Sequence, residues 1–107
     1  MKRDEIFIER IAAEIKFIRN HVDGKNKQGF LSNELLQHAI MMSIITIGEC
    51  ANQLSEAFKS QHNQIEWRQI VAVRNIAAHG YWQLDMEQVW QALEEDIPLL
   101  DNFIDSL

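Results

Sequence analysis

Residues 39–47 read AIMMSIITI, and this run decides the fold class of the chain. Apolar side chains fill almost every position, interrupted only by Ser43 and Thr46, so a helix here is apolar on nearly every side. Such a helix belongs at the centre of a bundle, where neighbours contact it all round. The run is far shorter than the roughly 20 residues of a membrane-spanning helix, so we expect a bundle helix and no membrane segment.

Helical spacing continues on both sides of this run. Apolar residues recur every three or four positions from about Asp4 to His21, which predicts a first helix. The polar residues 23–29 end that helix and form a loop. Ser32 is placed to cap the first turn of the second helix, which we expect to continue to about Phe58.

Two further helices complete the chain. Residues 60–64 are polar and predict a connection, followed by a third helix over residues 65–78 that stops at Gly80, since glycine tolerates the conformation that follows a helix end. Asp85, with a glutamine three residues later, predicts the cap of the last helix. Pro98 lacks an N–H, so we expect a kink or a restart there.

Nothing in the sequence alternates with the period of a β-strand. A length of 107 residues suits one domain. We therefore predict a single all-α domain over residues 1–107, an up-and-down bundle of four main helices with the last kinked or split near Pro98.

The net charge of −6 is distributed unevenly. Seven acids and no base follow from Asp85 onward, whereas the preceding residues hold nine acids and ten bases. The last helix is therefore acidic, and the rest of the chain remains free to form a local basic cleft for a nucleic acid. The start, MKRDE, lacks the apolar core of a signal peptide, and the single Cys50 suits a reducing compartment, so we expect a cytoplasmic protein.

Most motifs that carry chemistry are missing. The sequence has no H-E-x-x-H pair, no glycine-rich phosphate loop and no G-x-S-x-G, so we expect neither a metal nor a cofactor. His62 falls in a predicted loop, where we expect it to be solvated. Trp67 and Trp90 fall on helical stripes and are interpreted as core residues. Cys50, near the end of the apolar helix, is interpreted as a small apolar filler.

Residues 74–81, RNIAAHGY, carry the strongest chemical signal. An arginine stands on a mostly apolar helix, and a histidine follows at the helix end. A histidine, with an unperturbed pKa of about 6.5, can take a proton from a ribose 2′-hydroxyl or give one to a leaving oxygen. A fixed guanidinium suits the charge of a phosphorane. The segment is therefore a candidate for metal-free cleavage of RNA by Arg74 and His79.

The same residues also admit a structural interpretation. A histidine in the last turn is favoured by the helix dipole, and Gly80 is an ordinary residue after a helix end. Arg74 would then pair with a carboxylate such as Glu49 and satisfy a polar layer of the bundle.

Five ordered blocks resemble the HepT-like family, a branch of the HEPN superfamily. They are residues 47–55 (IGECANQLS), 65–70 (IEWRQI), 74–81 (RNIAAHGY), 89–90 (VW) and 96–100 (DIPLL). The third block matches the family motif of an arginine, four residues, a histidine, one residue and a tyrosine. Glu66 stands where that family usually has proline, a difference that affects only the start of a helix. The blocks are spread over residues 47–100, which is half of the chain.

The resemblance implies a ribonuclease toxin of a toxin–antitoxin pair that cleaves tRNA or mRNA without a metal. Arg74 and His79 would be the catalytic pair, with Asn75 and Glu49 as supporting polar groups. Tyr81 would match the tyrosine to which an MNT-type minimal nucleotidyltransferase antitoxin attaches AMP, and a larger hetero-oligomer with that antitoxin is implied. AMP at Tyr81 would place an anion where substrate phosphate binds.

The motif spacing adds an expectation of its own. At about 100° per residue, Arg74 and His79 point about 140° apart around a helix. They cannot share a face unless the helix unwinds, whereas a homodimer would bring two copies of the motif to one cleft. The resemblance to HEPN ribonucleases also implies a homodimer of this kind.

Two other functions fit the same residues. The chain can be a non-catalytic nucleotide- or substrate-binding subunit of a minimal nucleotidyltransferase. Its acidic last helix would then bind to a basic surface of that enzyme. It can also be a structural helical adapter in which Arg74 only forms an ion pair.

Overall fold

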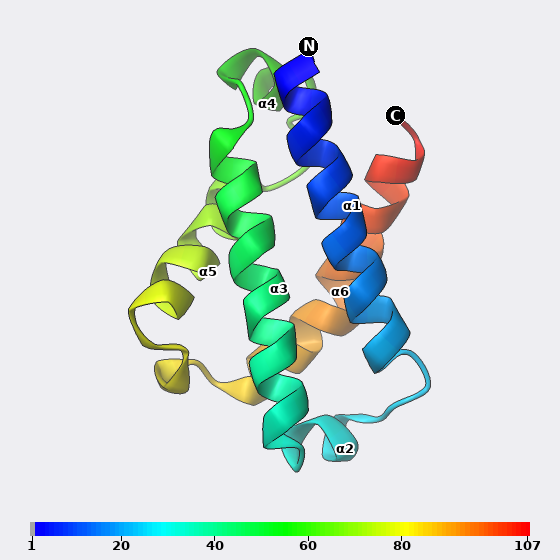
Figure 1. Cartoon of the computed structure of the whole chain (residues 1–107), viewed down its shortest axis with the longest axis vertical. Coiled ribbons are helices and arrows are strands. Elements are labelled where there is room, and N and C mark those ends of the chain that lie inside the picture. The colour runs from blue at the N-terminus through cyan, green and yellow to red at the C-terminus, as the bar shows by residue number, and fades with distance from the viewer. Residues whose placement is uncertain (1) are drawn as a thin grey trace.

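The computed structural model describes residues 2–107, apart from the side chains of Lys2 and Tyr81, and Figure 1 shows its course. Over these residues the chain forms six α-helices, one 3-10 turn and no strand. The elements are α1 (Lys2–Val22), α2 (Lys27–Leu31), α3 (Glu34–Gln53), α4 (Glu56–Gln61), α5 (Trp67–Gly80), η1 (Tyr81–Gln83) and α6 (Met86–Asp105). The all-α class is confirmed. The four long helices are α1, α3, α5 and α6, and the short α2 and α4 were not predicted.

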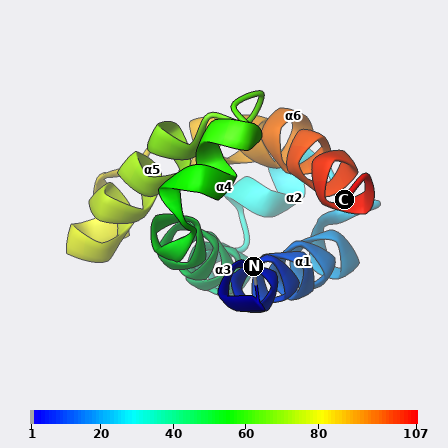
Figure 2. The same ribbon diagram turned by 90° about the horizontal axis from the view of Figure 1, so that it is seen from above.

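Helix α3 lies between α1 and α5 and packs against both (Figures 1 and 2). Successive long helices run in alternating directions, and α6 crosses on the far side to contact α1 and α2. The core contains side chains from every long helix, among them Ile11, Ile40, Trp67 and Leu93. The central position of α3 agrees with its apolar sequence, although one of its faces stays open, as described below.

The first connection is more ordered than the sequence predicted. Residues 27–31 form the short helix α2, whose first turn is capped by Asn26: its side-chain oxygen accepts from the N–H of Gly29 at 2.7 Å. Ser32 was wrongly predicted to start the next helix, because it ends α2 instead. The cap of α3 is Asn33, which accepts from the N–H of Leu36 at 3.0 Å.

The second helix ends earlier than predicted, at Gln53 rather than near Phe58. Ser55 begins the separate helix α4, and its hydroxyl oxygen accepts from the N–H of Phe58 at 3.1 Å. The buried carboxylate of Asp4 accepts from the Ser55 N–H at 2.8 Å and from its hydroxyl at 2.7 Å. These bonds tie the start of α1 to the break between α3 and α4, and they lower the pKa of Asp4.

The end of α5 and the start of α6 agree better with the predictions made from the sequence. Helix α5 stops at Gly80, as predicted, and this glycine has a φ of +149° that other residues rarely adopt. Asp85 caps α6, as predicted, accepting from the N–H of Glu87 at 2.9 Å. Of the kink or restart expected near Pro98, the restart is wrong, since α6 continues through this residue; the kink stays a prediction. None of the described helices combines the length and hydropathy needed to cross a membrane.

Candidate active site

Arg74 lies at the contact between α5 and α3, where it is held by two side chains. Its Nε donates to Oε1 of Glu49 on α3 at 2.5 Å, and its Nη2 donates to the same oxygen. Its Nη1 donates to Oδ1 of Asn75 at 2.5 Å. The structure thus brings together three of the predicted site residues. The Arg74–Glu49 pair of the structural interpretation is present, but its side chains are 26% and 46% exposed, so it is not a closed interior pair.

Gly48 explains how Arg74 comes to lie against α3. A Cβ placed on Gly48 would stand 2.2 Å from the Cβ of Arg74 and 3.3 Å from the backbone oxygen of Ile70. Only a residue without a side chain allows the two helices to approach so closely. The stem of Arg74 therefore crosses over the backbone of α3, and its guanidinium reaches Glu49 one residue further along.

The guanidinium keeps binding capacity in this arrangement. It carries five N–H donors, and the contacts to Glu49 and Asn75 use three of them. One N–H on Nη1 and one on Nη2 have no partner among the described side chains, and solvent reaches the Arg74 side chain. A pair of N–H groups on one guanidinium matches two oxygens of a phosphate. Arg74 is thus oriented by α3 and able to take an anion.

His79 lies five residues further along α5, in its last turn, and is exposed. Helix α5 stays regular to Gly80, so the five-residue spacing turns His79 about 140° from Arg74. A single chain therefore does not place the two side chains on one face of α5. Tyr81 begins the 3-10 turn η1, and its side chain lies outside the described part of the structure.

Other residues singled out in the sequence have structural roles. Trp67 and Trp90 are buried in the core, as predicted. Cys50 is buried, and this burial raises the pKa of its thiol, which fits an apolar filler better than a nucleophile. His62 is not simply solvated: it ends α4 half-buried, with its ring 4.5 Å from that of Phe58 and 5.2 Å from that of Phe103. Among the described residues no group of three or more His, Cys, Asp or Glu side chains is placed to hold a metal ion.

Sequence reasoning missed an exposed apolar surface beside the Arg74 cluster. Leu35 and Met42 of α3 are 82% and 65% exposed, and with Glu49 they recur every seven residues, so all three lie on one face of the helix. Trp82, which is 75% exposed, packs its ring over Gly80, the residue that follows His79. The signal was present in residues 39–47, since a helix that is apolar all round needs more neighbours than this chain supplies.

Comparison with known proteins identifies the class to which this fold and cluster belong. Residues 11–107 match the family described as ribonuclease HepT-like. A protein of Thermococcus cleftensis named "Probable ribonuclease HepT" is 30% identical over 108 residues, covering all of this chain and 98% of its own length. A protein of Caldanaerobacter subterraneus named a "Putative RNase" is 26% identical over 95% of this chain and 91% of its own length.

A longer relative carries the same region. The protein of Methanocaldococcus jannaschii named "Gamma-glutamylcyclotransferase and putative RNase" is 29% identical over 97% of this chain. The chain spans 47% of that relative's length. The comparison with solved structures found no match to this chain. The chain belongs to the HepT-like ribonuclease family.

Proposed function

We propose that the chain is a metal-independent endoribonuclease, and that Arg74 and His79 perform the cleavage. The observation that carries this proposal is the orientation of Arg74: Glu49 and Asn75 hold its guanidinium at the surface with two N–H donors left for an anion. The names of the relatives support RNA as the substrate.

The chemistry requires two proton transfers and one site for negative charge. One imidazole accepts the proton of the ribose 2′-hydroxyl, whose oxygen forms a bond to phosphorus. Arg74 stabilises the extra charge on the phosphorane oxygens. The bond to the 5′ oxygen then breaks, and a second imidazole donates the proton that this oxygen needs. The products are a 2′,3′-cyclic phosphate and a 5′-hydroxyl.

A homodimer supplies the second imidazole. Within one chain Arg74 and His79 lie about 140° apart on α5, so a cleft between two copies would combine both motifs. The exposed face of α3, with Leu35 and Met42, supports such an interface because it continues to Glu49. We expect His79 of one protomer to act as base and His79 of its partner as acid.

The biological role that fits this activity is that of a toxin in the cytoplasm, acting on tRNA or mRNA and neutralised by an MNT-type nucleotidyltransferase antitoxin in a larger hetero-oligomer. Tyr81, two residues after His79, is the expected AMP acceptor. An AMP group there adds a bulky anion beside the proposed phosphate site and would repel the substrate. A Tyr81→Phe variant should stay unmodified when it is incubated with ATP and the antitoxin. Modification at another residue would contradict the assignment.

Cleavage of labelled RNA in the presence of a chelator tests the nuclease proposal. His79→Ala and Arg74→Ala should each abolish cleavage without loss of helical circular dichroism, whereas His21→Ala, which changes another exposed histidine, should leave cleavage intact. RNA that is retained but not cut by the wild-type chain would instead support a non-catalytic binding subunit. A large loss of stability in Arg74→Ala with no cleavage by the wild type would support a structural adapter.

Mixed dimers test the division of labour between the two histidines. A heterodimer of wild-type and His79→Ala chains has one imidazole in the cleft, so we expect it to be nearly inactive. Activity near that of the wild-type dimer would show that one His79 suffices.

A further inference from the structure

The outer face of α5 is basic, although the chain as a whole is acidic. Residues 67–83, which form α5 and η1, include two arginines and one histidine and no acid, in a chain of net charge −6. Four exposed residues recur every three or four positions and define this outer face: Arg68, Ala72, Asn75 and His79. Helix α5 packs along α3 at the edge of the bundle, so its outer face stays open (Figures 1 and 2).

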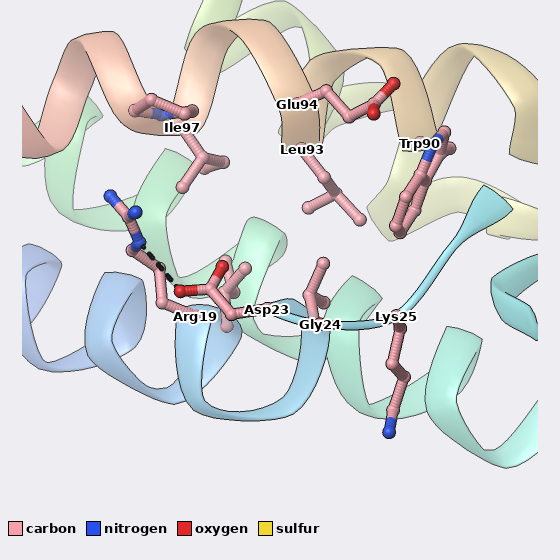
Figure 3. Close-up of a pocket in the computed structure, with 11 residues that line it drawn as sticks. Arg19, Asp23, Gly24, Lys25, Trp90, Leu93, Glu94 and Ile97 are labelled. Atoms are coloured by element: carbon pink, nitrogen blue, oxygen red, sulfur yellow. Dashed lines mark hydrogen bonds and ion pairs between the residues drawn. The ribbon is translucent and has the colours of Figure 1, made fainter.

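Arg68, at the start of the outer face, is free to bind an anion. Among the described residues no carboxylate pairs with its guanidinium. Arg19 shows the opposite case: in the groove between α1 and α6 it is joined to Asp23 (Figure 3), and it also pairs with Asp101 at 2.8 Å. The outer face of α5 thus keeps a positive charge that can contact a polyanion.

Trp82 follows the other end of the outer face and is 75% exposed. One end of its ring rests on Gly80: a Cβ added to Gly80 would stand 2.6 Å from Cη2 and 2.8 Å from Cζ2 and Cζ3 of the indole. The φ of +149° at Gly80 is one that other residues rarely adopt, so the glycine serves both the turn and the ring contact. The indole is therefore held in place next to the residue that follows His79, and most of its surface is open to solvent.

The neighbours of Trp82 select the chemistry of its ligand. Arg74, with two N–H donors that no described residue uses, lies six residues before Gly80, which is about 9 Å along the axis of α5. An exposed aromatic ring beside groups that bind phosphate is the arrangement with which proteins hold single-stranded nucleic acid, because a base stacks on the ring while its backbone follows the positive charge. An apolar protein partner would instead have to bury Arg68 and His79, which is costly for charged and polar groups.

We propose that Trp82 stacks on the base of an unpaired nucleotide next to the scissile phosphate, and that Arg68 binds another phosphate of the same strand along the outer face of α5. This inference rests on the proposed ribonuclease function for its substrate. It adds that the RNA is cut where it is single-stranded, as in a loop, because a base within a duplex is already stacked on both sides. Stacking selects unpaired RNA without selecting one base, since every base has a face that stacks.

A short single strand of 2′-O-methyl RNA tests binding apart from cleavage, because its blocked 2′ oxygen cannot attack phosphorus. The strand should shift the indole N–H signal of Trp82 in a ¹⁵N–¹H spectrum and leave that of Trp67, which donates to the backbone oxygen of His62, unchanged. Trp82→Leu should weaken binding about tenfold, and Trp82→Phe much less, since a phenyl ring still stacks. Phe17→Leu is the matched control, because it removes another exposed aromatic ring, on α1, and should leave the affinity unchanged.

Strands that each lack one base locate the contact. At one position the missing base should weaken binding to the wild type about tenfold and binding to Trp82→Leu hardly at all, because both changes remove the same contact. Arg68→Gln should weaken all strands alike and reduce the slope of log affinity against log salt by about one. Lys16→Gln, which removes an exposed charge from α1, should leave that slope unchanged.

Equal affinities of wild type and Trp82→Leu for the methylated strand would overturn the proposal, as would equal binding of the single strand and a duplex. Dissociation of a dimer by Trp82→Leu in sedimentation would also overturn it, since Trp82 would then cover a second copy of the chain. The proposed nuclease function fails separately. If the wild type binds the methylated strand at Trp82 but does not cut unmodified RNA, the stacking site is supported and the nuclease function is contradicted.

Discussion

The Cβ of Arg74 on α5 occupies the space that a side chain on Gly48 of α3 would need: an added Cβ would stand only 2.2 Å from it. The same contact directs the guanidinium of Arg74 to Glu49, the residue after Gly48. The crossing of the two helices and the orientation of the candidate catalytic arginine therefore depend on one glycine.

Gly48→Ala should push α3 and α5 apart. Overpacking of this kind costs about 1–3 kcal/mol, which outweighs the gain of about 1 kcal/mol expected when alanine replaces glycine within a helix. Urea unfolding should show a lower midpoint, and RNA cleavage should fall with it. Gly29→Ala is the control, because the Cβ there would meet only the side-chain oxygen of Asn26, at 3.2 Å. Unchanged stability of Gly48→Ala would show that the crossing tolerates a methyl group.

Glu49→Ala separates the positioning of Arg74 from the stability of the fold. The pair is partly exposed, so its loss should reduce the free energy of unfolding by less than about 1 kcal/mol. RNA cleavage should fall by about tenfold or more, because the guanidinium loses the carboxylate that orients it. The control is Glu56→Ala, which removes the exposed partner of Lys59. A loss of stability without a change in single-turnover cleavage would assign Glu49 a purely structural role.

Met42→Glu tests the proposed interface between two copies. A charge in the centre of the exposed apolar face of α3 should dissociate the dimer, because an unpaired carboxylate would be desolvated there. Sedimentation analysis should show monomers, and RNA cleavage should be lost with the dimer. Ile6→Glu is matched to it, since Ile6 of α1 is 59% exposed and lies on another helix. Dissociation by both variants, or by neither, would argue against a specific interface on α3.

Asp4 makes the stability of the chain depend on pH. The N–H and the hydroxyl of Ser55 donate to its carboxylate and hold its pKa in the folded chain below the ordinary value of 3.8. This contribution is fully present above pH 3.8 and is lost as the pH falls through the lower pKa of the folded state. The urea unfolding midpoints of wild type and Asp4→Asn should be measured above and below pH 3.8. The difference between the two proteins should shrink as the pH falls below 3.8. A constant difference across this range would mean that ionisation of Asp4 contributes nothing.

Much of the fold follows from local pattern. Several features could be predicted from the sequence because each depends on neighbours within one or two helical turns. They are the apolar periods of α1, α5 and α6, the stop at Gly80 and the cap at Asp85. The break after Gln53 was not readable, since it depends on Asp4, which lies 51 residues away from Ser55. The candidate site divides in the same way. The motif from Arg74 to Tyr81 is visible in the chain, whereas the role of Gly48 is not.

The sequence by itself determined the helical class, the family motif and the 140° between Arg74 and His79, because helical spacing is set by the covalent geometry of the chain. Only the tertiary structure decided that Arg74 is held against Glu49 with two N–H donors that no described residue uses, and that one apolar face of α3 stays uncovered. These features depend on which helices approach each other and how closely, and that follows from packing among distant residues.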